Sequence, residues 1–264
     1  MPRPKKRLGQ HFLYDPGILR RIADALEIEG DEAVLEIGPG PGGLTAQLAT
    51  RTPHLFAIEK DQAFLAHLRQ HFPNLTLIHG DALELDWHAL VGQGRFRVIG
   101  NIPYNITSPL LEKALRPPRP VCIVYLVQRE VADRVAALPG TAEYGALSVG
   151  VQAVTTVERL FTVPAGAFRP RPKVSSAVLR LRPRPEPLVS DAEIAPFRRF
   201  VVGLFGFRRK QLSRALRDLT GAPVSDVVSW LASVGLHETI RPGELGPDTF
   251  ARLYRAIPVS ILPE

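Results

Sequence analysis

Short apolar runs alternate with amphipathic stretches along the first half of the chain. Patterns typical of buried strands lie at residues 33–37, 55–58, 75–78, 96–99 and 121–127, and helical spacing occurs near 44–50, 62–70, 108–116 and 130–138. This alternation is typical of βαβ units, so it predicts a parallel sheet covered by helices. In front of the first strand, Asp15-Pro16 supplies an N-cap and a first-turn proline for a helix whose apolar face is Ile18, Leu19, Ile22 and Leu26.

The second half of the chain changes character near residue 183. The pattern first predicts a helix at 144–153 and strands at 155–163 and 174–181. Residues 182–187 then alternate proline with charged side chains, which is the composition of a stiff linker. Beyond it the apolar spacing is helical, at 192–204, 210–219, 225–234 and 247–256. We therefore predict an α/β domain over residues 1–183 and a small all-α domain over residues 184–264.

The composition is that of a soluble globular protein. Of the 264 residues, 45% are hydrophobic and 22% are charged, and no apolar run has the length of a membrane span. Polar residues interrupt the stretch after the basic amino terminus, so we expect no signal peptide. The single cysteine, Cys122, excludes a disulfide within the chain and indicates a reducing compartment. The expected location is the cytoplasm, without membrane contact.

Basic residues concentrate in three windows. Residues 1–21 contain six basic and one acidic side chain, residues 169–184 six and none, and residues 198–217 seven and none. Because the whole chain carries +7, these windows together carry +18 and the remainder carries −11. A basic face on an otherwise acidic protein is typical of nucleic-acid binding, although any single window is equally compatible with a solvated helix face.

Residue types suited to a nucleoside follow the first three predicted strands. Gly38-Pro39-Gly40-Pro41-Gly42-Gly43 allows a sharp turn close to a ligand. Glu59 ends the second strand 21 residues after Gly38, where its carboxylate can accept hydrogen bonds from ribose hydroxyls. Asp81 follows the third strand and can accept one from an adenine amino group. The glycine pattern and this spacing fit NAD and S-adenosylmethionine alike.

The segment Asn101-Ile102-Pro103-Tyr104 follows the fourth predicted strand. The proline restricts its own backbone and that of the preceding residue, so the carbonyls around it can be held rigidly. Together with the Asn101 side-chain oxygen they could accept both hydrogens of an exocyclic amine, and Tyr104 offers a flat face for an unstacked base. The alternative interpretation is an ordinary turn after a strand.

Six segments together resemble the ribosomal RNA adenine N6,N6-dimethyltransferases, and among them the small-subunit (16S) type associated with kasugamycin resistance. The resemblance covers nearly the whole chain and rests on residues 8–13 (LGQHFL), 35–40 (LEIGPG), 80–82 (GDA), 100–104 (GNIPY), 128–132 (QREVA) and 168–174 (FRPRPKV). It implies a Rossmann-like class I methyltransferase sheet, a small all-α C-terminal domain and S-adenosylmethionine as cofactor.

Carried over position by position, the resemblance implies a cofactor site under a closing segment at residues 8–13. Its members are His11, Leu13, Gly38, Gly40, Glu59, Asp81 and Asn101. The target base would meet Asn101, Pro103 and Tyr104 on one side and Phe168 on the other; packing under the proline-rich loop is the alternative for Phe168. RNA contacts are expected at Arg171, Lys173, Arg208, Arg209 and Lys210, and no metal is expected. His11 departs from the usual asparagine, but a neutral imidazole also offers one donor and one acceptor.

The resulting expectation is dimethylation of two adjacent adenosines in the 3′-terminal hairpin of small-subunit rRNA, by a monomer acting on the immature 30S subunit during ribosome biogenesis. The Asn101 oxygen and the Ile102 or Pro103 carbonyl would hold the amine and favour a reactive nitrogen. Two alternatives stay open: an erythromycin-resistance-type methylase of large-subunit rRNA, and a non-catalytic RNA-binding assembly factor. DNA adenine methylases more often carry two prolines after the Asp or Asn, which Ile102 does not match.

Overall fold

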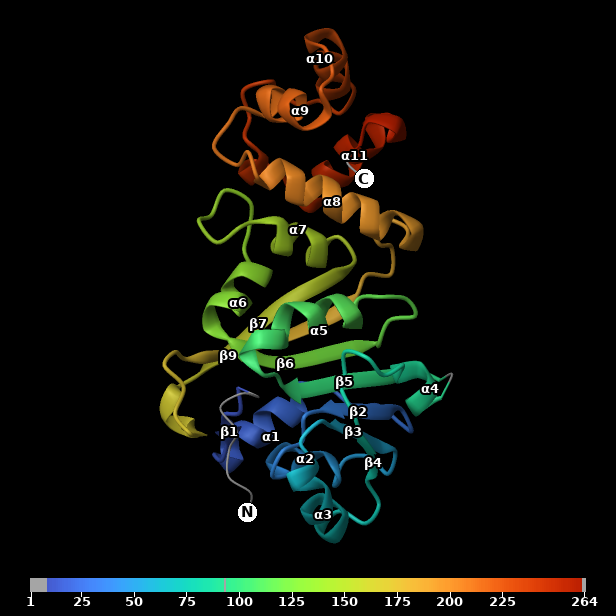
Figure 1. Ribbon diagram of the computed structural model, residues 1–264, viewed down its shortest axis with the longest axis vertical. Helices are drawn as coiled ribbons and strands as arrows, with labels where there is room; N and C mark the ends of the chain where they lie inside the picture. The colour runs from blue at the N-terminus through green and yellow to red at the C-terminus, as the bar shows by residue number, and fades with distance from the viewer. Residues whose placement is uncertain (1–8, 93, 263–264) are drawn as a thin grey trace. The chain divides into compact units, whose positions relative to one another are not determined.

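The computed structural model, which describes residues 9–92 and 94–262, contains a seven-stranded sheet of order β4-β3-β2-β5-β6-β9-β7 (Figure 1). The strands β2 to β6 run parallel, and β9 pairs antiparallel with β6. The predicted α/β class with a largely parallel sheet is therefore confirmed. The strand bounds are β2 (Ala33–Ile37), β3 (Leu55–Glu59), β4 (Thr76–His79), β5 (Phe96–Asn101), β6 (Cys122–Gln128), β7 (Thr155–Val163) and β9 (Ser176–Pro183).

Helices alternate with the parallel strands in the order expected for βαβ units. They are α1 (Pro16–Asp24), α2 (Gly43–Leu48), α3 (Gln62–His71), α4 (Trp87–Val91), α5 (Thr107–Ala114) and α6 (Arg129–Val135). Side chains of α1 and α2 join those of β2, β5, β6 and β9 in one apolar cluster. β6 is buried along nearly its whole length, so its sequence is continuously apolar. The short helix α4 was not predicted, because five residues are too few to show a helical period.

Aspartates set where several of these helices begin. Asp15 accepts a hydrogen bond from the Ile18 N–H at 2.9 Å, with Pro16 in the first turn, as predicted. Asp61 caps α3 in the same way, and Asp86 caps α4. Each carboxylate satisfies an N–H group that a helix leaves without a partner in its first turn.

A two-stranded sheet, which no pattern in the sequence predicts, connects the N-terminal segment to a distant part of the chain. β1 (Phe12–Leu13) pairs antiparallel with β8 (Phe168–Arg169), so that Phe12 lies opposite Arg169 and Leu13 opposite Phe168. The Tyr14 N–H extends the contact by donating to the Ala167 carbonyl at 3.2 Å. Two residues per strand carry no readable period, so only the folded chain reveals this pairing.

The chain divides into two compact units. One contains the residues up to Ala132 and Glu158–Pro183, and the other contains Asp133–Val157 and Arg184–Glu264. The predicted division at residues 183 and 184 coincides with one of these boundaries, but residues 133–157, which we predicted in the first domain, group with the second unit. The physical reason is that α7 (Ala146–Gln152) packs against α8 (Ile194–Phe205).

The second unit is helical apart from the first residues of β7. Its other α-helices are α9 (Leu212–Thr220), α10 (Val224–Ser233) and α11 (Pro247–Ala256). Stacked and edge-on aromatic pairs form its core; the rings of Phe205 and Phe250, for example, lie 5.6 Å apart.

Short 3₁₀ helices complete the fold of both units: η2 (Tyr104–Ile106), η3 (Ala165–Ala167), η4 (Asp191–Glu193), η5 (Pro242–Glu244) and η6 (Val259–Ile261). Within residues 9–92 and 94–262, the structure has no helix with the length and apolarity needed to cross a membrane.

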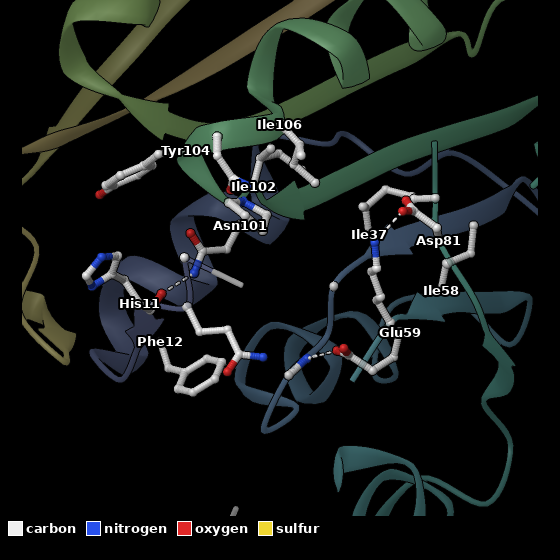
Figure 2. Close-up of a pocket in the computed structure, with 18 of the residues that line it drawn as sticks. His11, Phe12, Ile37, Ile58, Glu59, Asp81, Asn101, Ile102, Tyr104 and Ile106 are labelled. Atoms are coloured by element: carbon white, nitrogen blue, oxygen red, sulfur yellow. Dashed lines mark hydrogen bonds and ion pairs between the residues drawn. The ribbon is translucent and has the colours of Figure 1, made fainter. Parts of the chain in front are cut away.

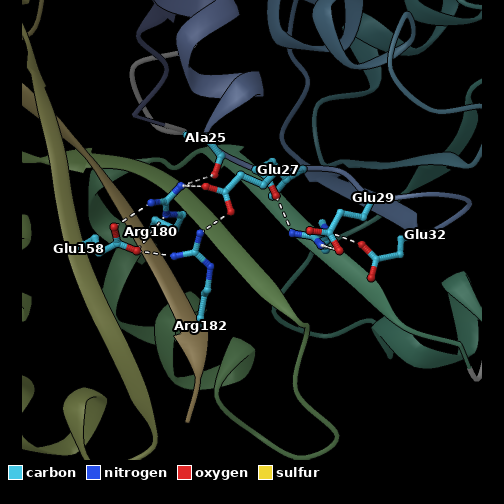
Figure 3. Close-up of polar contacts among 9 residues, drawn as sticks. Ala25, Glu27, Glu29, Glu32, Glu158, Arg180 and Arg182 are labelled. Atoms are coloured by element: carbon cyan, nitrogen blue, oxygen red, sulfur yellow. Dashed lines mark hydrogen bonds and ion pairs between the residues drawn. The ribbon is translucent and has the colours of Figure 1, made fainter. Parts of the chain in front are cut away.

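An ionic cluster fastens the end of α1 to the outer strands of the sheet (Figure 3). Arg180 of β9 donates to both carboxylate oxygens of Glu158 on β7, at 3.0 and 2.7 Å. Arg180 and Arg182 also pair with Glu27, which follows α1. The hydrogen bond from Arg180 holds the pKa of the Glu158 carboxyl below its usual range. These arginines from the second basic window therefore serve the fold.

A matched pair of buried tyrosines offers a test of the core. Tyr125 in β6 is fully buried, and its hydroxyl is the one buried side-chain polar atom among the described residues without a hydrogen-bond partner. The Tyr144 hydroxyl, by contrast, donates to the Leu245 carbonyl at 2.7 Å. We expect Tyr125→Phe to raise the free energy of unfolding by about 1 kcal/mol and Tyr144→Phe to lower it by about 1–3 kcal/mol. Denaturant unfolding of both variants measures this, and equal losses would contradict it.

Candidate active site

A pocket opens at the carboxyl ends of the parallel strands (Figure 2). Because parallel strands end at one edge of a sheet, residues far apart in sequence meet there. The N-terminal segment, residues 9–12, forms another wall. The pocket is lined by Gly9, Gln10, His11, Phe12, Ile37, Gly38, Gly40, Ile58, Glu59, Lys60, Gly80, Asp81, Ala82, Asn101, Ile102, Pro103, Tyr104, Asn105 and Ile106.

The glycine-rich turn after β2 is shaped by positive backbone angles and a close aromatic neighbour. Gly38 and Gly40 have φ angles of 69° and 54°, which favour glycine. A Cβ at Gly40 would lie 2.8 Å from Cε1 of Phe12, so a side chain there would push the N-terminal segment away. The Gly40 N–H donates to Glu59 Oε2 at 2.9 Å, which fixes the turn against β3.

Two buried carboxyl groups, Glu36 and Glu59, flank this turn. They are 1% and 5% exposed. Glu36 accepts a hydrogen bond from Thr45 Oγ1 at 2.7 Å, and Glu59 accepts from the N–H groups of Gly40 and Asp61. Burial raises the pKa of Glu36 to about 8 and also raises the pKa of Glu59. No basic side chain in the described part of the chain forms an ion pair with either group, so the site favours a ligand that brings positive charge or hydrogen-bond donors.

Asp81 lies at the rim of the pocket and, unlike Glu36 and Glu59, pairs with a basic side chain. Its Oδ2 lies 2.5 Å from Lys60 Nζ, and its Oδ1 accepts from the Leu83 N–H at 2.9 Å. Burial opposes ionisation of Asp81, but these hydrogen bonds outweigh it and hold the pKa of the carboxyl below its usual range. Asp81 is therefore a fixed, ionised acceptor at neutral pH.

The side-chain amide of Asn101 has a defined orientation. Its Nδ2 donates to the His11 carbonyl at 2.8 Å, and since a carbonyl only accepts, Oδ1 must point the other way. Figure 2 shows that Oδ1 lies on the side of Tyr104. Within the described ranges, no group donates to this oxygen. It is a preorganised acceptor facing the pocket.

The backbone beside Asn101 supplies one further acceptor. The Pro103 carbonyl already accepts from the Ile106 N–H at 3.1 Å as part of the turn that begins η2. No N–H group of the described residues donates to the Ile102 carbonyl, while the Ile102 N–H is held by Leu126. The sequence left open whether the Ile102 or the Pro103 carbonyl is the second acceptor for an amine. The structure favours the Ile102 carbonyl.

Tyr104 presents an aromatic surface next to this acceptor pair. Its hydroxyl lies 2.8 Å from Ser176 Oγ, which fixes the ring. The His11 ring stacks near it, with ring centroids 5.5 Å apart and an interplanar angle of 27°. His11 Nδ1 donates to the Pro170 carbonyl at 2.7 Å, so the imidazole is tethered to the segment after β8.

Comparison with known proteins decides the family. The model of the ribosomal RNA adenine dimethylases matches residues 1–241. The chain belongs to this family. Its relatives include proteins named ribosomal RNA small subunit methyltransferase A: one from Geobacter metallireducens is 42% identical over 97% of this chain and 96% of the relative, and one from Maridesulfovibrio salexigens is 37% identical over 97% and 96%.

Solved structures agree with the family assignment. A dimethyladenosine transferase from Plasmodium falciparum superposes with a TM-score of 0.81 at 26% identity, covering 92% of this chain and 96% of its own. The 23S rRNA methyltransferase ErmE superposes with a TM-score of 0.73 at 29% identity, covering 93% and 98%. The chain is therefore an S-adenosylmethionine-dependent rRNA adenine methyltransferase with a class I methyltransferase fold.

The pocket fits the cofactor of this dimethylase family. S-adenosylmethionine carries a sulfonium and an ammonium group. Glu59, which lines the pocket, and Glu36, which lines the smaller cavity beside it, form no ion pair with a basic side chain of the described residues. Gly40 leaves room for close approach because no Cβ fits beneath Phe12. Glu59 and Asp81 end neighbouring strands, where ribose hydroxyls and an adenine amine can meet them. When bound, the cofactor supplies the electrophilic methyl group.

Most of the predicted site residues meet at this pocket. It brings together His11, Gly38, Gly40, Glu59, Asp81, Asn101, Pro103 and Tyr104. Leu13 lines a smaller adjoining cavity that shares Phe12, Gly38 and Asn101 with the main pocket. Leu8, part of the predicted closing segment, lies outside the described residues. Lys60 and Phe12 were missed as site residues, although Lys60 directly follows Glu59 and Phe12 lies in a segment that we predicted to close over the cofactor.

Phe168 corrects the sequence analysis. We expected it on the second face of the target base, but it is 2% exposed, lies in the apolar cluster with Leu13 and Leu19, and does not line the pocket. Pairing of β8 with β1 turns its ring inward. The alternative, packing beneath the proline-rich loop, describes its position in this structure.

The predicted RNA-binding residues fall into two groups. Arg171, Lys173 and Arg209 are exposed. Arg208, however, donates to the carbonyls of Thr141 and Ala142, and Lys210 pairs with Asp218 at 2.8 Å. Within the second unit, two of the Arg208 donors are thus used by backbone carbonyls, and the Lys210 charge has an acidic partner. The basic residues at positions 3–7 lie outside the described residues.

A glycine to alanine pair tests how tightly Asn101 is held. A Cβ at Gly100 would lie 2.6 Å from the Ile37 carbonyl oxygen and 2.8 Å from Ile102 Cδ1, so β5 must shift in Gly100→Ala. We expect a loss of about 1–3 kcal/mol in the free energy of unfolding and weaker S-adenosylmethionine binding by calorimetry. Gly150→Ala in α7, where a Cβ meets nothing within 4 Å, is the matched control and should gain up to about 1 kcal/mol. Equal behaviour of the two variants would contradict the crowding at Gly100.

Proposed function

We propose that this protein dimethylates the exocyclic amines of two adjacent adenosines in the 3′-terminal hairpin of small-subunit (16S) rRNA. Support comes from relatives of nearly equal length that are named for the small subunit. The observation that carries the proposal is Asn101 Oδ1, an acceptor to which no described residue donates, in the pocket that Tyr104 also lines. We further propose that the protein acts as a cytoplasmic monomer on the immature 30S subunit.

The pocket would act on the amine by orientation and electrostatics. An adenine amine is a weak nucleophile because its lone pair is delocalised into the ring. Hydrogen bonds to Asn101 Oδ1 and the Ile102 carbonyl favour a pyramidal nitrogen, and they strengthen as positive charge develops on it. Stacking on Tyr104 would hold the extruded base while the nitrogen aligns with the methyl group. His11, stacked on Tyr104 and bound to the Pro170 carbonyl, would move aside or share this surface.

The second methylation makes a different demand on the same groups. After the first transfer the nitrogen keeps one hydrogen, so only one of the two acceptors can be used. The side-chain oxygen of Asn101 and the backbone oxygen of Ile102 belong to one rigid turn, which keeps either of them in reach of the remaining hydrogen. The same pocket can then serve both turnovers after rotation of the amine.

Substitutions at the acceptor and at the ring test this assignment. We expect Asn101→Ala to lower kcat by about 10²- to 10³-fold, since it removes an acceptor made for the transition state. Tyr104→Ala should lose most activity because base stacking is worth about 1–3 kcal/mol, whereas Tyr104→Phe keeps the ring and should retain most of it. Thermal unfolding checks that each variant is folded. Near-full activity of Asn101→Ala and Tyr104→Ala would remove the pocket from the mechanism.

The target itself is decided by mapping the methyl label. The protein is incubated with labelled S-adenosylmethionine and undermethylated small subunits, large subunits or DNA, and the modified bases are located. Label at two adjacent adenosines of small-subunit rRNA is expected. Label in large-subunit RNA would favour the erythromycin-resistance type of activity, and bound but unlabelled RNA would favour a non-catalytic assembly factor.

The exposed basic residues would position the RNA backbone. Arg171 and Lys173 follow the segment that is tethered to His11, and Arg209 lies in the helical unit; phosphate contacts of this kind do not read sequence. We expect Arg209→Ala to weaken RNA binding and to reduce the slope of log affinity against log salt by about 1. Arg208→Ala is the matched control: it should lower stability, because the carbonyls of Thr141 and Ala142 lose a donor, and leave the slope unchanged. A filter-binding salt titration distinguishes the two, and reversed effects would contradict the assignment.

A further inference from the structure

Glu36 lies on the same face of the sheet as Asn101, inside the wall of the active site. In the parallel pairing of β2 and β5, Glu36 lies opposite Ile99, so Asn101, two residues further on, projects to the same face. Strand spacing places the two Cα atoms roughly 8 Å apart. Both residues line the smaller cavity, which shares Phe12, Gly38 and Asn101 with the main pocket. The proposed methyl transfer assigns no role to Glu36.

Among the described residues, no basic side chain forms an ion pair with the Glu36 carboxyl. From β3 it faces the Glu59 carboxyl, which disfavours its ionisation, and from α2 it receives the Thr45 hydroxyl. The remaining lining residues of the small cavity carry no titratable side chain: Phe12, Leu13, Leu19, Ile22, Gly38, Pro39, Pro41, Gly43, Leu44, Asn101 and Leu126. Ionised Glu36 would thus be a buried charge stabilised by a single hydroxyl and repelled by Glu59, an unfavourable state in the free protein.

The reaction brings a positive charge to this location. The methyl group must approach an amine held at Asn101, with the reacting atoms about 3–3.5 Å apart, so the sulfonium comes to the Asn101 end of the pocket. A cation at short range in a buried site strongly favours the ionised form of a carboxyl group.

We propose that Glu36 senses the charge of the cofactor, being neutral in the free protein and ionised when a sulfonium is bound, so that the site distinguishes S-adenosylmethionine from S-adenosylhomocysteine by one proton. This inference rests on the proposed position of the methyl donor next to Asn101. It makes Glu36 a specificity-determining residue for the methyl donor over the product.

The methyl transfer balances in protons and electrons when solvent accepts one proton and supplies another. The amine lone pair forms the N–C bond, and the electron pair of the S–C bond returns to sulfur, which becomes a neutral thioether. The methylated nitrogen releases one proton to solvent. Glu36, which has lost its positive partner, takes up one proton from solvent. The thioether product then leaves a neutral site that holds it less tightly than it holds the sulfonium.

The pH dependence follows from the sign of this linkage. Burial raises the pKa of Glu36 to about 8 in the free protein, and the bound sulfonium lowers it. Below pH 8, binding of S-adenosylmethionine therefore releases the Glu36 proton, and its affinity rises with pH, by up to about tenfold per pH unit, until the pH reaches about 8. S-adenosylhomocysteine has no sulfonium, so its binding leaves Glu36 protonated.

The experiment counts protons by titration calorimetry of the full chain in buffers of different ionisation enthalpy at pH 7. The amino group of the ligand itself titrates near pH 8, so the readout is the difference between wild type and Glu36→Gln. Gln keeps the size of the side chain and can still accept from Thr45. With S-adenosylmethionine we expect wild type to release about 0.9 proton more than the variant, the protonated fraction of a group with a pKa of about 8. With S-adenosylhomocysteine the difference should be close to zero.

A second variant and a second ligand complete the test. Thr45→Val removes the hydrogen bond that favours ionised Glu36, so the pH midpoint of S-adenosylmethionine affinity should move upward even if Glu36→Gln does not fold. Sinefungin, which carries an ammonium group in place of the sulfonium methyl, should behave like S-adenosylmethionine. With S-adenosylmethionine, equal proton release by wild type and Glu36→Gln would overturn the inference. A difference between wild type and variant that is the same for S-adenosylmethionine and S-adenosylhomocysteine would also overturn it. Absence of any S-adenosylmethionine binding would instead overturn the cofactor site itself.

Discussion

The hydrogen bond from the Asn101 side chain to the His11 carbonyl connects the two halves of the active site, which are 90 residues apart in sequence. It holds the N-terminal segment over the cofactor pocket, and at the same time it orients Asn101 Oδ1, the acceptor that we propose for the target amine. The β1–β8 pairing and the His11–Pro170 contact support the same segment from the other side. The acceptor is oriented before substrate arrives, so little reorganisation is left for the reaction step.

The distribution of charge separates structural acids from functional ones. Glu27, which follows α1, and Glu158, on the outer strand β7, are paired with Arg180 and Arg182, whose proximity favours the ionised carboxylates. Glu36 and Glu59 are more deeply buried, yet from the described residues they receive only hydroxyl and N–H donors. No described arginine forms an ion pair with either carboxyl group. We propose that a cationic cofactor offsets the cost of burying these groups, which would couple the stability of the pocket to its ligand.

The basic windows contain both side chains that stabilise the fold and side chains that remain exposed. A guanidinium group that finds two backbone carbonyls, as Arg208 does, stabilises a local turn. Arg209, its neighbour in sequence, is exposed and makes no hydrogen bond or ion pair with any described residue, so we propose it as a phosphate contact. Net charge in a window is therefore an upper limit for the charge that RNA can meet.

The sequence by itself determined the parallel sheet, the caps at Asp15 and the family, because strand length, helical period and ordered motifs are local signals. It also placed Gly38, Glu59, Asp81 and Asn101 at one edge, since consecutive parallel strands end together. Only the tertiary structure decided which groups remain available there: it turned Phe168 into the core, used the Pro103 carbonyl in a turn, and grouped residues 133–157 with the helical unit. These outcomes depend on contacts between residues distant in sequence, and no local pattern records which of several possible partners a side chain meets.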